Sequence, residues 1–142
     1  MAQVRTLGPG DTGVLTNVAA DVFDRAVDAE LAGEFLRDPR HHLAVAVDDG
    51  VVVGMASAVH YIHPDKPPEL WINEIAVAPT HQEQGLGKRL MRALFALGRD
   101  LGCREAWVLT EPSNLPAQRL YQAVGGADSL ATMFSFDLTD GG

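Results

Sequence analysis

A short segment that follows an apolar run and precedes an amphipathic one has the residues of an anion-binding turn. It reads His81-Gln82-Glu83-Gln84-Gly85-Leu86-Gly87-Lys88. A helix that begins here has first-turn N–H groups without intrahelical acceptors, at the positive end of its dipole, so these groups can bind an anion. Glycines at 85 and 87 let an oxygen approach without a Cβ in the way. We therefore expect a phosphate or pyrophosphate to bind here.

Two common nucleotide motifs do not fit this turn. The Walker pattern needs four residues between Gly and Gly-Lys-Ser/Thr, and the Rossmann pattern needs a third glycine where Leu90 stands. The remaining pattern, Q-x-x-G-x-G, resembles the Q/R-x-x-G-x-G/A signature of the GNAT superfamily, and the preceding LWINEIAVAP resembles that family's fourth strand. The resemblance implies acetyl-CoA as co-substrate. The turn residues implied to bind its pyrophosphate are Gln82, Gln84, Gly85, Leu86, Gly87 and Lys88, and the backbone of Ile75, Ala76 and Val77 is implied to pair with its pantetheine arm.

A second segment, Asn114 to Tyr121, resembles the superfamily motif N-x-x-A-x-x-L-Y. The resemblance implies that Asn114, Ala117 and Tyr121 lie at the cofactor, with Tyr121 as the acid that protonates the departing thiolate. A phenol with a reference pKa of about 10 can donate that proton. The alternatives are that Asn114 is only a helix N-cap and Tyr121 only a core aromatic.

Acetyl transfer also needs a neutral amine and a stabilised oxyanion. Glu74 is a carboxylate within an apolar strand, so we expect it to accept the ammonium proton, directly or through water, or to serve as a counter-charge; a solvated edge glutamate is the alternative. The Val77 amide is the expected oxyanion donor, and His63 is an alternative base. The histidines are scattered in sequence, and we expect no metal.

The hydrophobic pattern predicts elements that can position these groups. Strands are expected over 3–6, 43–47, 51–59, 70–77, 105–110 and 132–138, and helices from Asp11 through Phe23 and over 28–37, 85–99 and 114–124. This is a mixed α/β chain. The family resemblance implies a central, mostly antiparallel sheet flanked by about four helices.

Composition sets further limits. With 142 residues we expect one domain over 1–142. A net charge of -8 disfavours nucleic acid as a partner. The sequence has no apolar run of about 20 residues and no signal-like start, so a soluble cytoplasmic protein is expected. Cys103 is the single cysteine, which excludes an intrachain disulfide.

Scattered segments resemble the small aminoglycoside 3-N-acetyltransferases: RTLGP, Val22-Phe23-Asp24, VVVG, NEIAV and Phe136-Asp137-Leu138. The resemblance implies an aminoglycoside acceptor acetylated at the 3-N position, and hence a role in antibiotic resistance. That family has an aspartate where Glu74 stands, and more acids than Glu111 alone after the fifth strand. For a polycationic acceptor we expect an acidic substrate site of Glu74, Glu111 and Asp137, with Asp24 or Glu34 as further members.

Other functions remain open. The acceptor can be another small amine, such as a polyamine, an amino acid or a peptide N-terminus, and a non-catalytic acyl-CoA-binding module is a further alternative. Because members of the superfamily often pair, we expect a homodimer, with the apolar run MFSF as an interface edge.

Overall fold

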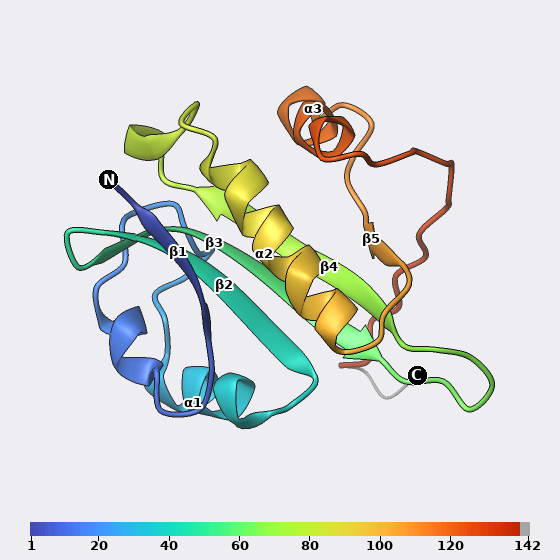
Figure 1. Ribbon diagram of the computed structural model, residues 1–142, viewed down its shortest axis with the longest axis horizontal. Coiled ribbons are helices and arrows are strands. Elements are labelled where there is room, and N and C mark those ends of the chain that lie inside the picture. The colour runs from blue at the N-terminus through green and yellow to red at the C-terminus, as the bar shows by residue number, and fades with distance from the viewer. Residues whose placement is uncertain (140–142) are drawn as a thin grey trace.

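A computed structural model describes residues 1–139 and shows one five-stranded sheet (Figure 1). The strands lie in the order of the chain, which is β1 (Gln3–Leu7), β2 (His41–Asp48), β3 (Val51–Tyr61), β4 (Glu69–Val77) and β5 (Ala106–Val108). The first four are antiparallel, and β5 runs parallel to β4. The α-helices are α1 (Ala29–Arg37), α2 (Leu86–Asp100) and α3 (Leu115–Ala123), and two short 3₁₀ helices are η1 (Thr12–Thr16) and η2 (Pro79–His81). The mixed α/β, mostly antiparallel architecture is confirmed.

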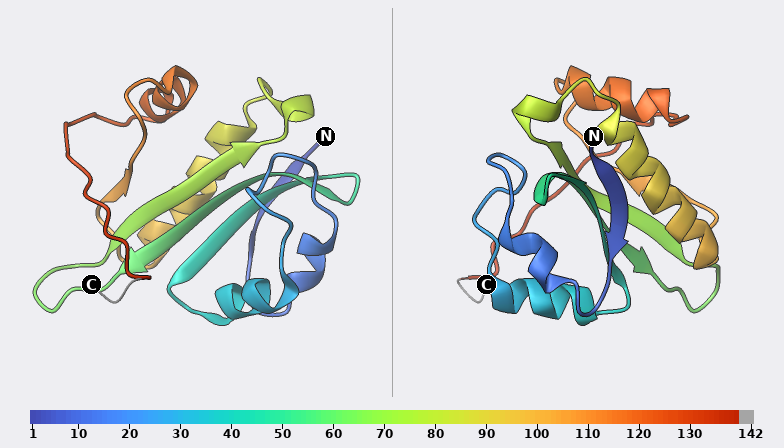
Figure 2. Two further views of the ribbon diagram at one scale, coloured as in Figure 1. Left: turned by 180° about the vertical axis from the view of Figure 1, so that it is seen from behind. Right: turned by 60° about the vertical axis from the view of Figure 1, so that its left-hand side comes forward.

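The two faces of the sheet are covered differently (Figure 2). Helix α2 buries its apolar stripe against one face, with Leu90 and Leu94 fully inaccessible to solvent. Its Gly98 packs on Leu70, where an added Cβ would lie 3.1 Å from Leu70 Cδ2. Helix α1, η1 and the loop between them lie over the other face. Side chains of β2, β3 and β4 therefore alternate between the α2 side and the α1 side.

The sheet is built on a tight hairpin between β2 and β3. Asp49 and Gly50 both have positive φ, 52° and 75° respectively, which is the conformation of a two-residue turn that matches the strand twist. The register along β3 and β4 shifts at Asn73, because Glu74 pairs with Ser57 while Ile72 pairs with the next residue, Ala58. Asn73 is the extra residue of a β-bulge.

The predicted helix from Asp11 through Phe23 is wrong beyond its first turn. A 3₁₀ helix covers only Thr12–Thr16. The chain then pairs with the start of β3, since the Ala19 amide donates to the Val52 carbonyl and the Val52 amide donates to the Asn17 carbonyl, both at 2.9 Å. This pairing takes the backbone groups that a helix would have used. Leu15 and Val22 of the predicted apolar stripe are buried. The prediction of which residues are buried was correct for these two, although the predicted helical conformation was wrong.

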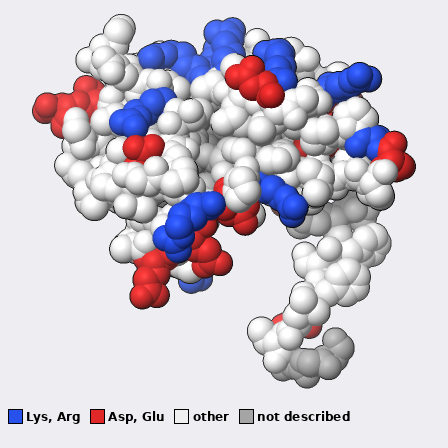
Figure 3. All heavy atoms as spheres, turned by 60° about the horizontal axis from the view of Figure 1, so that its bottom comes forward, with Lys and Arg blue, Asp and Glu red and all other residues white. Residues whose placement is uncertain are grey.

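The predicted strand over 132–138 is also wrong. Residues 126–139 carry no strand assignment, and their large apolar side chains face solvent. The exposed fractions are 100% for Leu130, 73% for Met133, 77% for Phe134, 81% for Phe136 and 80% for Leu138. The reason is physical: a strand needs a neighbouring strand to pair with, and this tail projects away from the rest of the molecule (Figure 3).

Within residues 1–139, none of the helices is long and apolar enough to cross a membrane.

Candidate functional site

The predicted anion-binding turn lies at the start of α2, as expected. Gly85 is the N-cap residue with φ of 77°, a left-handed conformation that glycine adopts without strain. The first intrahelical bond runs from the Arg89 amide to the Gly85 carbonyl, at 3.2 Å. The amides of Leu86, Gly87 and Lys88 therefore precede the helical ladder and lack acceptors within the helix. Open space surrounds Gly85, because no atom lies within 4 Å of the place where a Cβ would be.

The second glycine of the turn has a different reason to be small. A Cβ on Gly87 would lie 3.2 Å from Leu120 Cδ2 and 3.3 Å from its Cδ1. Gly87 thus lets α3 approach α2 closely. Tyr121 follows Leu120 on α3, so this contact also fixes where Tyr121 stands relative to the turn.

The end of β4 is tied to the same turn. Gln82 Nε2 donates to the Val77 carbonyl at 3.1 Å, and the Ala78 amide donates to the Val53 carbonyl of β3 at 2.8 Å. Backbone groups alternate in direction along a strand. Ala76 and Ala78 therefore face β3, while the amides of Ile75 and Val77 face the β5 side. Of the three β4 residues predicted to pair with an extended ligand, Ile75 and Val77 have the right direction and Ala76 does not.

The β5 side of this part of β4 has no strand partner among residues 1–139. The two strands pair only from Leu70–Ala106 to Ile72–Val108. After β5 the chain leads to α3, whose first turn is capped by Asn114, since the Asn114 side chain accepts from the Ala117 amide at 3.2 Å. The free β4 edge, the first turn of α2 and the packed face of α3 are thus brought together, which is what binding an extended anion-bearing ligand requires.

Tyr121 is half-buried on α3 and packs against the main core. Burial raises the pKa of its phenol above the ordinary value of 10. The phenol therefore keeps its proton at neutral pH, as a proton donor must.

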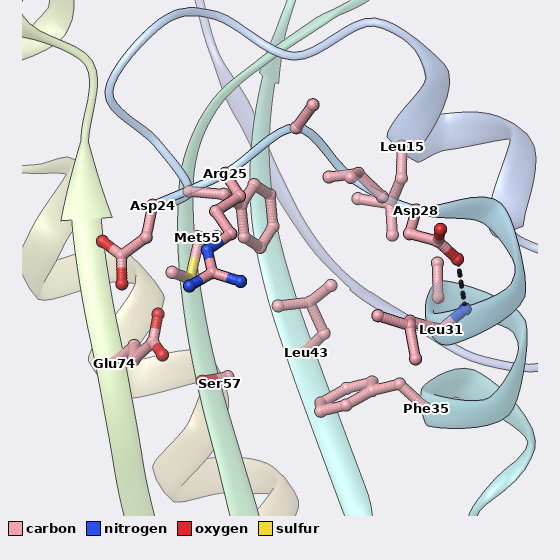
Figure 4. A pocket seen from close by; sticks show the side chains of 14 residues that line it. Leu15, Asp24, Arg25, Asp28, Leu31, Phe35, Leu43, Met55, Ser57 and Glu74 are labelled. Carbon is pink, nitrogen blue, oxygen red and sulfur yellow. Dashed lines mark hydrogen bonds between the residues drawn. The ribbon is translucent and has the colours of Figure 1, made fainter.

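On the α1 side of the sheet, the Glu74 side chain lines a pocket of about 460 Å³ (Figure 4). The bulge at Asn73 sets this direction, because Glu74 pairs with Ser57, whose side chain also lines the pocket. The carboxylates of Asp24 and Glu74 point toward one another, and the Arg25 guanidinium lies alongside them. The remaining wall is mostly apolar. The full lining is Leu15, Phe23, Asp24, Arg25, Ala26, Val27, Asp28, Leu31, Ala32, Phe35, Leu43, Met55, Ser57 and Glu74.

Two of the predicted substrate residues lie elsewhere. Glu111 is exposed in the loop after β5, where its carbonyl accepts from the Asn114 amide. Asp137 is in the exposed tail, and its carboxylate accepts from the Thr139 amide at 2.9 Å. Neither residue lines the pocket, and neither does Glu34. His63 Nε2 lies 3.0 Å from Glu69 Oε2, also outside the pocket lining.

Sequence reasoning missed Arg25 and Ser57. Arg25 follows Asp24 just beyond the helix that was predicted to end at Phe23, in a stretch with no predicted element, so its direction could not be anticipated. Ser57 could have been found, since it lies two residues from Met55 along β3 and therefore shares a face with it. A hydroxyl at a position that pairs with Glu74, in an otherwise apolar strand, signals a polar site.

Comparison with known proteins places this geometry among acetyl-transferring enzymes. Residues 15–126 match the model of the acetyltransferase (GNAT) family. An aminoglycoside N(6')-acetyltransferase type 1 of Salmonella typhimurium (strain LT2) is 33% identical over 113 residues, which cover 75% of this chain and 78% of the relative.

Solved structures share the fold. An aminoglycoside acetyltransferase from an uncultured soil metagenomic sample, in complex with sisomicin, superposes with a TM-score of 0.82 at 19% identity and covers 97% of both chains. The aminoglycoside N-acetyltransferase AAC(6')-Iy in complex with CoA gives a TM-score of 0.80 at 23% identity, over 97% of this chain and 95% of that one.

Proposed function

The chain belongs to the GNAT acetyltransferase family, and from this premise we propose that it transfers an acetyl group from acetyl-CoA to a primary amine of a polycationic small molecule, an aminoglycoside foremost. The observation that carries the proposal is the pocket with Asp24 and Glu74, which opens beside the part of β4 to which residues 1–139 supply no strand partner on its β5 side. An acceptor with several ammonium groups is attracted by this pair of carboxylates.

The residues at the start of α2 and the end of β4 suit acetyl-CoA. The free amides of Leu86, Gly87 and Lys88 offer donors for its pyrophosphate, and the space at Gly85 leaves room for an oxygen. The amides of Ile75 and Val77 offer the pantetheine arm a strand edge. The Arg89 guanidinium on the same helix donates to the Ala2 carbonyl at 3.0 Å and ties α2 to the N-terminus.

The reaction moves three protons, two off the acceptor nitrogen and one onto the sulfur, and Glu74 and Tyr121 can serve these transfers. Glu74, directly or through one water, accepts a proton from the acceptor ammonium, and the freed nitrogen lone pair attacks the thioester carbonyl carbon. The Val77 amide donates to the oxygen that becomes negative. The C–S bond then breaks, the amide C–N bond remains, and Tyr121 gives its proton to the sulfur. The nitrogen still carries one proton too many, and this second proton passes to the Tyr121 phenolate, directly or through water, which restores the phenol. The raised pKa of Tyr121 keeps the phenol protonated until the C–S bond breaks and also makes it a weaker acid, so the proton moves only as negative charge develops on the sulfur.

The position that is acetylated has two candidates. The resemblance seen in the sequence points to the 3-N amine, while the Salmonella relative acts at N(6'). Both are primary amines and meet the same chemical requirements. The NMR spectrum of the isolated product distinguishes them, because acetylation shifts only the protons next to the modified nitrogen.

Thiol release from acetyl-CoA, measured with sisomicin and with a panel of diamines, tests the proposal. Tyr121→Phe should lower kcat by about 10²-fold or more, and Glu74→Gln should lower kcat/KM by a similar factor. Glu105→Gln, an exposed glutamate before β5, is the matched control and should match the parent. Absence of turnover with every amine, despite binding of acetyl-CoA, would leave only a non-catalytic acyl-CoA-binding role.

A second acceptor class is favoured by Arg25. A guanidinium in the pocket pairs well with a carboxylate, so an amino acid with a side-chain amine is the second candidate. Lysine and 1,5-diaminopentane differ by the carboxylate alone. If the amino acid is the substrate, lysine is used better than the diamine, and Arg25→Gln removes the difference.

We also propose that the protein forms a homodimer in which a second copy covers the tail. Phe134, Phe136 and Leu138 alternate along the tail and are 77–81% exposed, more apolar surface than a monomer usually leaves in water. Light scattering after size exclusion should give twice the chain mass, and the double variant Phe134→Ser/Phe136→Ser should give the mass of one chain. A monomeric parent at assay concentration would refute the proposal.

A further inference from the structure

Three aromatic rings gather on the sheet away from the hydrophobic core. Trp71 and Trp107 lie with ring centroids 4.9 Å apart, and Tyr61 lies 5.8 Å from Trp71 and 6.4 Å from Trp107. Their planes agree within 16°. In a straight column of three stacked rings, the distance between the two outer centroids would equal the sum of the two shorter distances. The longest distance here is only 6.4 Å, so the rings form a compact, nearly parallel group. We call Tyr61, Trp71 and Trp107 the aromatic platform.

The platform lies on the pocket side of the sheet. Trp71 pairs with Val59 of β3 and with Trp107 of β5, while Glu74 pairs with Ser57. Since Ser57 and Val59 are two residues apart, they share a face, and so do Glu74 and Trp71. Without the bulge at Asn73, Trp71 and Glu74 would point to opposite faces. The bulge thus places the platform and the carboxylate on one surface.

The spacing between the aromatic platform and Glu74 allows one ligand to contact both. Two residues along a strand span about 7 Å, so the platform begins about one sugar ring beyond Glu74. Tyr61, at the far side, pairs with Glu69, and it is 38% exposed. Trp71 and Trp107 are half-buried.

Packing of the main core does not account for the platform. None of its three rings is a member of the core cluster or of the partly buried shell around it. Three large aromatics on an accessible sheet face, next to an acidic pocket, are what binding an ammonium-bearing ring requires, because ring faces attract cations and pack against sugar C–H groups.

We propose that the aromatic platform binds a second, cationic ring of the acceptor while the reacting amine lies at Glu74. This inference rests on the proposed function and deepens it, because it selects acceptors with two or more linked aminosugar or aminocyclitol rings over short amines. Charge complementarity supports this occupant: the ligand is a polycation, and the protein carries a net charge of -8. In this arrangement the platform contributes to acceptor affinity and leaves the chemical step unchanged.

Intrinsic tryptophan fluorescence reports on the platform directly, because Trp71 and Trp107 are the only tryptophans of the chain. Sisomicin, titrated into the parent protein, should change tryptophan emission in a saturable way, whereas 1,4-diaminobutane should not. Tyr61→Leu keeps both reporters and should raise the KM for sisomicin roughly 3- to 10-fold, the size of one cation–π contact. It should leave kcat, and the KM for 1,4-diaminobutane, unchanged. Tyr61→Phe should behave as the parent.

The contrary outcomes are separate from failure of the proposed function. Turnover of sisomicin with unchanged emission would overturn the platform proposal while the acetyltransferase proposal stands. Equal KM increases for both acceptors in Tyr61→Leu would show a structural role and would overturn it too, as would turnover of short amines without any sisomicin binding. If Phe136→Ser alters the emission and sisomicin does not, the platform holds the tail and the proposal is wrong.

Discussion

The pH dependence of folding should depend on His42. This imidazole is 9% exposed on β2, and its Nε2 lies 2.8 Å from Nδ1 of His60, so one ring donates and the other accepts. Burial, followed by the charges of His60 and His41, lowers the pKa of His42 from 6.5 to about 4. The unfolded chain, with a pKa near 6.5, takes up the proton first as the pH falls. The stability due to neutral His42 is therefore complete above about pH 6.5 and is lost as the pH falls toward 4.

The size of the effect follows from the two pKa values. At pH 5 they give a loss of about 2 kcal/mol relative to pH 8, and screening by solvent at the rim of the pair reduces this to about 1–2 kcal/mol. Urea unfolding at pH 8 and pH 5 measures the difference in the free energy of unfolding. His42→Gln should be less stable than the parent at pH 8 but should lose about 1–2 kcal/mol less between the two pH values.

His41→Gln, which removes the neighbouring exposed imidazole, is the control and should keep most of the parent's loss. The same loss in His42→Gln as in the parent would refute the assignment of this pH dependence to the buried histidine.

Three further predictions concern the cofactor and acceptor sides. Gly87→Val should lower the melting temperature by several degrees, and kcat with it, because its methyl groups would enter the space of Leu120; Gly87→Ala should do less, and equal effects would contradict the packing argument. Gln82→Leu should raise the KM for acetyl-CoA up to about fivefold through loss of one hydrogen bond to the Val77 carbonyl, with an unchanged KM for the acceptor. Asp24→Asn should raise the KM for sisomicin severalfold at low salt and much less at 0.5 M NaCl, since the attraction is screened; a salt-independent change would point to packing instead.

The turn and strand end of the proposed cofactor site could be predicted from the sequence because their parts are local. A helix start, two glycines and a β4 run that ends before Pro79 specify the turn without reference to distant residues. Even there, one residue has a second reason to be small. Gly87 was expected to admit an oxygen, and the structure shows in addition that a Cβ there would crowd Leu120, which lies 33 positions further along the chain. No local pattern contains that contact.

The acceptor side depends on contacts that a hydrophobic pattern does not encode. Valines at helical spacing predicted a helix through Phe23, but pairing of Asn17 and Ala19 with Val52 leaves the chain irregular and sends Asp24 and Arg25 into the pocket. The bulge at Asn73 could not be predicted from the hydrophobic pattern either, although it determines on which face of the sheet the Glu74 side chain lies. Alternation predicted a strand over 132–138, where the tail has no partner in residues 1–139. Each failure concerns a segment whose conformation depends on a distant strand, or on a strand partner that residues 1–139 do not supply. The elements of the proposed acceptor site are therefore less constrained by local sequence than the turn and strand edge proposed for acetyl-CoA, which would let one cofactor scaffold serve different amines.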